Sequence, residues 1–161
     1  MVTVRPIEPG DRPTVERLQI ELWGAAYSVS HGIVFRPAEL PGFLTLDGDE
    51  IVGMLTYVPP EDGTVEIVTV DALRRHQGIG TLLLNAVHTR AGSLGASCLV
   101  LTTTNDNVDA LRFYQRRGFQ LTALRPGQAH ESRKLKPEFP LIGNYGIPIT
   151  DELELTRAVT G

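Results

Sequence analysis

Apolar positions near the start of the chain repeat with the period of an amphipathic helix. Val15, Leu18 and Leu22 fall at i, i+3 and i+7, and Asp11 stands before them as a candidate N-cap. This spacing predicts a helix over residues 12–26. Such a helix turns one apolar stripe toward a core and leaves its other faces in solvent.

Shorter runs with strand character follow this helix. Residues 42–70, "GFLTLDGDEIVGMLTYVPPEDGTVEIVTV", predict three strands in succession. The pair Asp47-Gly48 and the stretch from Pro59 to Gly63 are turn sequences, so the neighbouring strands are expected to be antiparallel. A short strand is also predicted at residues 3–6, and no long element is predicted for residues 27–42.

A second amphipathic helix is predicted after residue 78. Its apolar stripe has the spacing i, i+3, i+4, i+7 and i+8 and consists of Ile79, Leu82, Leu83, Ala86 and Val87. The next run, "ASCLVLTTT", is almost continuously apolar, which is typical of a buried strand. A strand, a helix and another strand in this order predict a parallel pair joined by a helical crossover.

The last third of the chain combines short elements with a long irregular stretch. The sequence "VDALRFYQRR" predicts a short helix, and "FQLTAL" predicts a strand. Residues 125–150 are rich in proline and glycine, with "AHESRKL" as one or two helical turns, and "DELELTRAV" predicts a closing strand. A connection of this length is expected to be either a packed surface arm or a wall of a binding pocket.

Composition and charge limit the classes of partner and of metal site that the chain can have. The chain has 161 residues, of which 42% are hydrophobic, as expected for a single domain over residues 1–161. Its net charge of −4 gives no general attraction to nucleic acid or to an anionic membrane, and a cytoplasmic location is the expectation. Cys98 is the only cysteine, which excludes an intramolecular disulfide and a multi-cysteine zinc site, and no metal is expected.

The stretch "RRHQGIG" (residues 74–80) places two glycines between a predicted strand and a predicted helix. The first amides of a helix and its dipole favour an anion, and Gly78 and Gly80 have no Cβ to keep a phosphate away. A Walker loop is excluded because no Lys-Ser/Thr pair follows. The dinucleotide fingerprint is excluded because Leu83 stands where its third glycine is needed. The form that remains is Arg/Gln-x-x-Gly-x-Gly.

This motif resembles the pyrophosphate-binding loop of the GNAT superfamily of N-acetyltransferases. Residues 107–119, "NVDALRFYQRRGF", are similar to the family's Asn-x-x-Ala-x-x-Phe-Tyr-x-x-x-Gly-Phe segment, and the resemblance spans about residues 3–124. It implies an acyltransferase with a GNAT-like mixed α+β fold. In that fold helices flank a mostly antiparallel sheet of about seven strands, and two parallel central strands splay apart.

The resemblance also implies the cofactor. In this family acetyl-CoA lies between the splayed strands, its pantetheine pairs with the backbone of the first strand, and its pyrophosphate sits on the amides of the glycine loop. The implied cofactor-binding residues are Val68, Thr69, Val70, Arg75, His76, Gln77, Gly78, Ile79, Gly80, Thr81, Asn107 and Tyr114. Two of them have structural alternatives, because Asn107 is also a good helix cap and Arg75 also fits a solvated surface.

The implied reaction is the direct attack of an amine on the acetyl thioester. By motif position Tyr114 protonates the departing thiolate, and a backbone N–H near Thr69 or Val70 stabilises the oxyanion. Packing beside Phe113 is the alternative for Tyr114. The base is left open between Glu66, a histidine and a water relay. Because Glu66 has apolar neighbours in its strand, a raised pKa is expected for it.

The sequence does not name the acceptor. A small-molecule amine and a protein amine both remain open, and so does the oligomeric state, a homodimer included. His31 and His130 lie in irregular segments that could reach an acceptor, and the basic side chains of residues 125–136 could attract an anionic one. Two other functions also fit the motifs: a non-catalytic acyl-CoA-binding sensor, and a GNAT enzyme with a different acyl donor such as succinyl-CoA.

Overall fold

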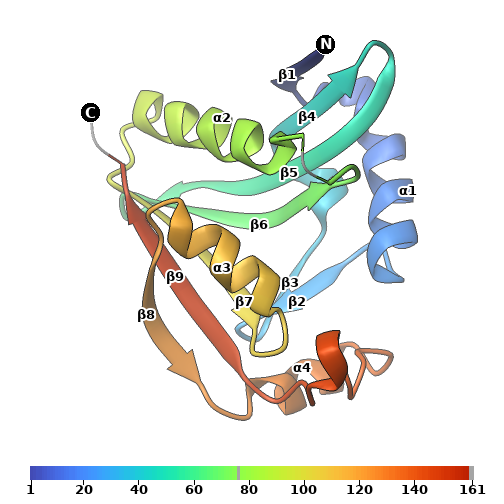
Figure 1. Cartoon of the computed structure of the whole chain (residues 1–161), viewed down its shortest axis with the longest axis vertical. Helices are drawn as coiled ribbons and strands as arrows, with labels where there is room; N and C mark the ends of the chain where they lie inside the picture. Colours follow the sequence, from blue (N-terminus) through green and yellow to red (C-terminus); the bar gives the residue numbers. More distant parts are fainter. Residues whose placement is uncertain (76, 160–161) are drawn as a thin grey trace. The chain divides into compact units, whose positions relative to one another are not determined.

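The structure, a computed structural model, describes residues 1–75 and 77–159 (Figure 1). The chain forms two compact units. Of the described residues, the first contains Met1–Tyr27, residues 36–75 and 77–99, and residues 158–159, and the second contains Ser28–Phe35 and Val100–Arg157. The expectation of one domain over residues 1–161 stays a prediction.

The first unit is built on four antiparallel strands. They are β1 (Val2–Pro6), β4 (Gly42–Asp47), β5 (Glu50–Glu61) and β6 (Thr64–Ala72), and they pair in that order. Asp47 pairs with Glu50 across the first hairpin turn. The two antiparallel hairpins predicted from the sequence are therefore confirmed.

The second hairpin turn is tighter than predicted. Only Asp62 and Gly63 form it, with φ of 51° and 74°, and positive φ at both central residues is what a type I′ turn requires. Pro59 and Pro60, predicted as turn residues, lie in β5 at a register shift that follows Val58. Proline is tolerated at such an irregularity because no ladder hydrogen bond from its nitrogen is needed there.

Two helices cover opposite faces of this sheet. From α1 (Arg12–Trp23), Val15 packs against Leu44 and Met54, which are cross-strand partners on one face. From α2 (Ile79–Ser93), Ile79 approaches Gly53, the neighbour of Met54 in β5. Because neighbouring residues of a strand point to opposite faces, α1 and α2 lie on different sides of the sheet.

α1 begins at Arg12 as predicted, but it ends earlier than predicted. The helix stops at Trp23 rather than at residue 26, because Gly24 takes a left-handed conformation (φ 81°) and its N–H bonds to the carbonyl of Ile20. A 3₁₀ turn, η1 (Pro9–Asp11), precedes the helix. Asp11 is at the N-cap position, but its side chain accepts hydrogen bonds from Arg5 and from the backbone of Glu8 instead.

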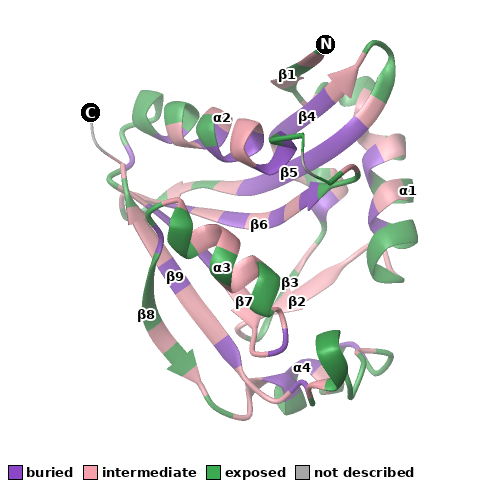
Figure 2. Ribbon diagram, viewed as in Figure 1, coloured by how far each residue is buried: buried purple, intermediate pink, exposed green. Residues whose placement is uncertain are grey.

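Buried residues concentrate in β4, β5, β6 and the inner side of α2 (Figure 2). In the predicted stripe of α2, Ile79, Leu83 and Val87 are buried, whereas Leu82 and Ala86 are half-buried. The predicted stripe is therefore confirmed, with Ile79, Leu83 and Val87 as its most buried residues.

The second unit contains the elements predicted for the last third of the chain. β7 (Cys98–Thr104) enters it from the first unit, and α3 (Val108–Arg116), β8 (Gln120–Arg125), α4 (Gln128–Leu135), the turn η3 (Asn144–Gly146) and β9 (Glu152–Ala158) follow. A small hairpin of β2 (Ser28–Ser30) and β3 (Ile33–Phe35) also belongs to this unit. This hairpin and the turn η2 (Pro37–Glu39) of the first unit lie where the sequence predicted no long element.

The longer strands form one sheet in the order β1-β4-β5-β6-β7-β9-β8. β6 and β7 are neighbours in this order and α2 connects them, which is the strand–helix–strand pattern predicted from the sequence. The predicted fold class, a mixed α+β fold with a mostly antiparallel sheet of about seven strands, is confirmed. The splaying of β6 from β7 stays a prediction.

Candidate functional site

The glycine loop joins β6 to α2, as the sequence predicts. Gly78 is the N-cap of α2 and has φ 70°, and a side chain at this position would project into open space. α2 continues for 15 residues, and its N-cap residue, a glycine, has no side chain with which to cap the first amides. The N–H groups of Ile79, Gly80 and Thr81 are therefore the donors that this helix N-terminus offers to an anion.

The remaining residues predicted for the loop differ in their exposure. Arg75 and Gln77 are exposed, and Gly80 is buried in the first turn of α2. His76, also predicted to contact the cofactor, lies outside the described residues. The cofactor contacts of these side chains stay predictions.

Arg74 ties the glycine loop to the β4–β5 hairpin. Its Nη1 lies 2.6 Å from Oδ2 of Asp47, and its Nη2 pairs with Glu50. The hydrogen bond from Arg74, together with the N-terminal ammonium, lowers the pKa of Asp47. No sequence pattern reveals this anchor, because its two acidic partners stand 27 and 24 residues away along the chain.

β6 has a β-bulge where the pantetheine is expected. Ile67 pairs with Tyr57 and Thr69 pairs with Thr56, so Val68 is an extra residue between two successive partners. A bulge leaves backbone groups outside the ladder and changes the direction of side chains, and bulges are frequent next to ligand sites. The predicted pantetheine-binding segment, residues 68–70, begins at this bulge.

The bulge also aligns three polar residues of β6. Glu66, Thr69 and Asp71 pair with positions 58, 56 and 54 of β5, which alternate along one side of that strand. Because cross-strand partners share a face, these three side chains form a polar row on the face that α1 covers. Thr69 is buried and its Oγ1 lies 2.7 Å from Oγ1 of Thr56. Glu66, the predicted base, is half-buried, and its role stays a prediction.

Asp71 is the most unusual member of the polar row. It is 9% exposed, and its Oδ1 accepts a hydrogen bond of 3.0 Å from Nε1 of Trp23. Its Oδ2 is buried and accepts no hydrogen bond from the described residues. Burial raises the pKa of Asp71 to about 6, although the bond from Trp23 acts in the opposite direction. No sequence pattern distinguishes Asp71 from any other polar residue at the end of a strand.

In the second unit, two predicted site residues belong to α3: Asn107 is its N-cap residue and Tyr114 lies near its end. Oδ1 of Asn107 accepts a hydrogen bond from the Ala110 amide at 3.4 Å, which confirms the predicted cap. Tyr114 is half-buried, and its ring centroid lies 5.4 Å from that of Phe113 and 5.6 Å from that of Phe119. The packing role of Tyr114 is thus present, and its role as an acid stays a prediction.

In the segment between β8 and β9, two basic side chains, Arg133 and Lys134, contact other residues of the same segment. Nη2 of Arg133 donates to the carbonyl oxygens of Pro140 and Ile149 at 2.8 and 2.7 Å. Lys134 pairs with a glutamate of its own helix, and burial lowers the pKa of Lys136. Arg133 therefore stabilises this segment, and the attraction of an anionic acceptor by the basic side chains stays a prediction.

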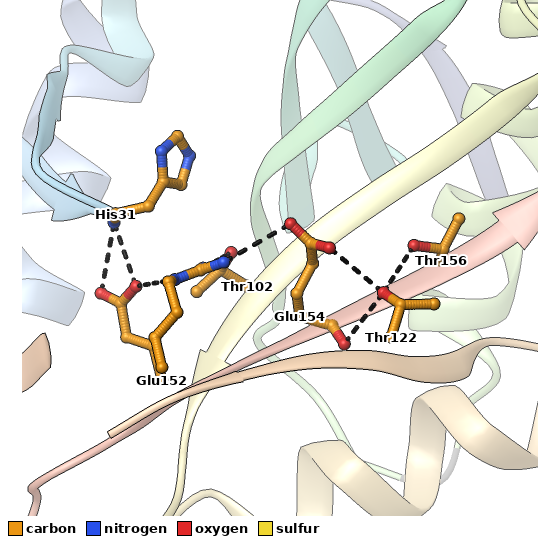
Figure 3. Close-up of polar contacts among 7 residues, drawn as sticks. His31, Thr102, Thr122, Glu152, Glu154 and Thr156 are labelled. Atoms are coloured by element: carbon orange, nitrogen blue, oxygen red, sulfur yellow. Dashed lines mark hydrogen bonds and ion pairs between the residues drawn. The ribbon is translucent and has the colours of Figure 1, made fainter. Parts of the chain in front are cut away.

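A polar network connects strands β7, β8 and β9 with the β2–β3 hairpin (Figure 3). Arg125 pairs with Glu152 at 3.2 Å and donates to Oγ1 of Thr102 at 2.8 Å. Glu152 is 3% exposed and also accepts the backbone N–H of His31 at 3.0 Å. His31 has φ 41°, and Figure 3 shows its ring directed away from Glu152. The network fixes the backbone of His31 and leaves its imidazole to other contacts.

Two kinds of site receive no support from the residues that the structure describes. Within residues 1–75 and 77–159, no three histidine, cysteine or acidic side chains gather to hold a metal ion. No helix in the same residues has the length and apolar character to cross a membrane.

Comparison with known sequences agrees with the motifs described above. The profile of the acetyltransferase (GNAT) family matches residues 9–119. The uncharacterized protein YxbD of Bacillus subtilis (strain 168) is 39% identical over 136 residues, which are 84% of this chain and 85% of that protein.

Solved structures share the fold. An IAA acetyltransferase from Bacillus cereus ATCC 14579 matches with a TM-score of 0.72 at 20% identity, over 98% of this chain and 99% of that one. A GNAT family acetyltransferase from Elizabethkingia anophelis, solved with acetyl-CoA bound, matches with a TM-score of 0.67 at 24% identity, over 98% and 97% of the two chains. Identities this low show a common fold.

Proposed function

Because this chain belongs to the GNAT family of acetyltransferases, we propose that it transfers the acetyl group of acetyl-CoA to a primary amine. The observation that carries the proposal is the glycine loop. Gly78, in a left-handed conformation, opens α2 shortly after the bulge of β6. This arrangement offers helix amides to a pyrophosphate and strand backbone outside the ladder to a pantetheine.

In this proposal the cofactor is held mostly by backbone. The N–H groups of Ile79, Gly80 and Thr81 bind the pyrophosphate, and the backbone of residues 68–70 binds the pantetheine. Arg75 adds a positive charge to the loop, while Arg74 holds the loop against the hairpin through Asp47. The acetyl-CoA in the Elizabethkingia anophelis protein supports this choice of cofactor.

The chemistry follows from the needs of a thioester. The amine nitrogen attacks the carbonyl carbon, a C–N bond forms and the C–S bond breaks. A backbone N–H at Thr69 or Val70 stabilises the oxyanion, and Tyr114 protonates the thiolate. An amine with a pKa of about 10.4 is mostly protonated at neutral pH, so it must lose a proton before it attacks. The acceptor itself is proposed only as an amine of a small molecule or a protein.

The test is an assay of CoA release with a panel of amines, run with acetyl-CoA and with succinyl-CoA. We expect release that depends on both acetyl-CoA and an amine. If CoA were released from succinyl-CoA but not from acetyl-CoA, the acyl donor would be succinyl-CoA instead. Binding of acetyl-CoA without release from any amine would favour the non-catalytic sensor instead.

A further inference from the structure

The removal of the amine's proton requires a group that the glycine loop does not supply, and the buried carboxyl of Asp71 is suited to it. Its Oδ1 is held by Nε1 of Trp23 at 3.0 Å. Its Oδ2 is buried and accepts no hydrogen bond from the described residues. A buried acceptor without a donor is costly, and native structures normally provide such an atom with a proton, a water or a ligand.

A second acceptor without a donor lies on the same helix face as Trp23. Gln19 stands one turn earlier in α1 and is 1% exposed. Its Oε1 also accepts no hydrogen bond from the described residues. Each of these two acceptors needs a donor, and for Asp71 a proton or a water molecule can supply it. The contact of α1 with the polar row is therefore suited to hold a proton.

Among residues 1–75 and 77–159, no cationic side chain pairs with Asp71. α1 presents Gln19 and Trp23 on this side, and β5 presents Met54 opposite Asp71; all three are uncharged. The nearby Arg74 is engaged by the acidic residues of the β4–β5 hairpin. Burial therefore dominates the pKa of Asp71, which lies at about 6. A carboxylate with this pKa is ionised at neutral pH and is still basic enough for proton transfer.

We propose that Asp71 receives the proton of the attacking amine through one water molecule. This role rests on the acetyl transfer proposed above. The amine first gives one proton to solvent and attacks in its neutral form. As its nitrogen bonds to the carbonyl carbon and the C–S bond breaks, the nitrogen loses a second proton to the water, and a proton of that water passes to Oδ2 of Asp71. The thiolate takes a proton from the general acid. The acid and Asp71 then exchange protons with solvent before the next turnover.

The polar row gives this transfer a short path. Asp71 lies two residues from Thr69 on the same face of β6, which is about 7 Å along a strand. The thioester is proposed to lie along residues 68–70. The proposal therefore places the amine nitrogen about 5–6 Å from Oδ2, the reach of one water with a hydrogen bond on each side. Trp23 acts as a positioning residue, because its hydrogen bond holds Oδ1 and leaves Oδ2 to accept the proton.

Glu66 at the other end of the polar row is the competing base. The test therefore measures kcat and kcat/KM from pH 5 to 9 for the unmodified protein, Asp71→Asn, Trp23→Phe and Glu66→Gln, with saturating acetyl-CoA and the best amine of the panel. The acetyl-CoA thermal shift of each variant controls for folding and cofactor binding.

We expect kcat of the unmodified protein to fall on the acid side with a midpoint near the pKa of Asp71, about 6. Asp71→Asn should lower kcat by about 10²-fold and remove this midpoint. Trp23→Phe should move the midpoint to higher pH, because the carboxylate loses the hydrogen bond that stabilises its charge. Glu66→Gln should leave the midpoint in place.

Trp23 is the only tryptophan of the chain, so its fluorescence adds a readout that does not need turnover. Its emission should titrate with the midpoint seen in kcat, and the emission of Asp71→Asn should not titrate there. An acid midpoint in kcat that survives Asp71→Asn, or a loss confined to KM, would overturn the role of Asp71. A fluorescence titration as expected, with no CoA release from any amine, would overturn the acetyl transfer and this role with it.

Discussion

Trp23 and Asp71 join the end of α1 to the end of β6 through one hydrogen bond of 3.0 Å. Trp23 is the last residue of its helix and is 53% exposed, whereas Asp71 is almost fully buried beneath it. The glycine loop begins just after this strand. The bond therefore links a helix of the first unit to the strand that leads into the proposed cofactor site.

Asp71 should make the stability of the protein depend on pH. Its pKa is about 6 in the folded protein and 3.8 without burial, so the folded state binds this proton more tightly. The stabilisation is complete below pH 3.8 and is lost as the pH rises through 6. Relative to the unmodified protein, Asp71→Asn should thus gain roughly 2 kcal/mol of unfolding free energy between pH 4 and pH 8. Denaturant unfolding of both proteins at the two pH values measures these free energies. The prediction would be contradicted if the difference between the two proteins were the same at pH 4 and pH 8.

The anchor formed by Arg74 should support cofactor binding. Asp47→Asn combined with Glu50→Gln releases Arg74, so the loop loses its preferred position and the affinity for acetyl-CoA should fall several-fold. The matched control, Glu16→Gln with Glu21→Gln, removes the same charge from α1. Isothermal titration compares the two. If the first double variant bound acetyl-CoA as tightly as the control, Arg74 would be a surface ion pair without this role.

Tyr114→Phe should separate the chemical role of the hydroxyl from the packing of the ring. We expect kcat to fall by about 10²-fold, while the melting temperature and the affinity for acetyl-CoA change little, because the ring keeps its contacts with Phe113 and Phe119. Tyr145→Phe is the control, since it removes an exposed hydroxyl that bonds to Asp109. Equal kcat values for the two variants would leave Tyr114 with packing alone.

The parts of the site that the sequence predicted are those with a local pattern. The stripe of α2, the two glycines at its start and the cap at Asn107 all depend on residues within a few positions of one another. Their hydrogen bonds and packing are set by helix geometry, so spacing in the sequence is enough to find them.

The parts that the sequence did not predict depend on distant partners. Asp71 becomes unusual through its burial and through its hydrogen bond with Trp23, which is 48 residues away in the sequence. The β2–β3 hairpin has strands of three residues each, too short to show a period, and its turn is tied to Glu152. The bulge at Val68 is visible only in the register of two paired strands. No local periodicity encodes contacts of this kind.

The central claim is that acetyl-CoA binds at the N-terminus of α2, and calorimetric titration of two glycine variants tests it most directly. Gly78 and Gly95 precede and follow the helix, both have positive φ (70° and 79°), and both face open space. Gly78→Val and Gly95→Val should therefore lose similar stability from left-handed backbone strain. The account predicts that the unmodified protein and Gly95→Val bind acetyl-CoA equally, while Gly78→Val binds at least about tenfold more weakly because its loop amides are displaced. Equal affinity of the two variants, or no binding by the unmodified protein at millimolar acetyl-CoA, would contradict the claim.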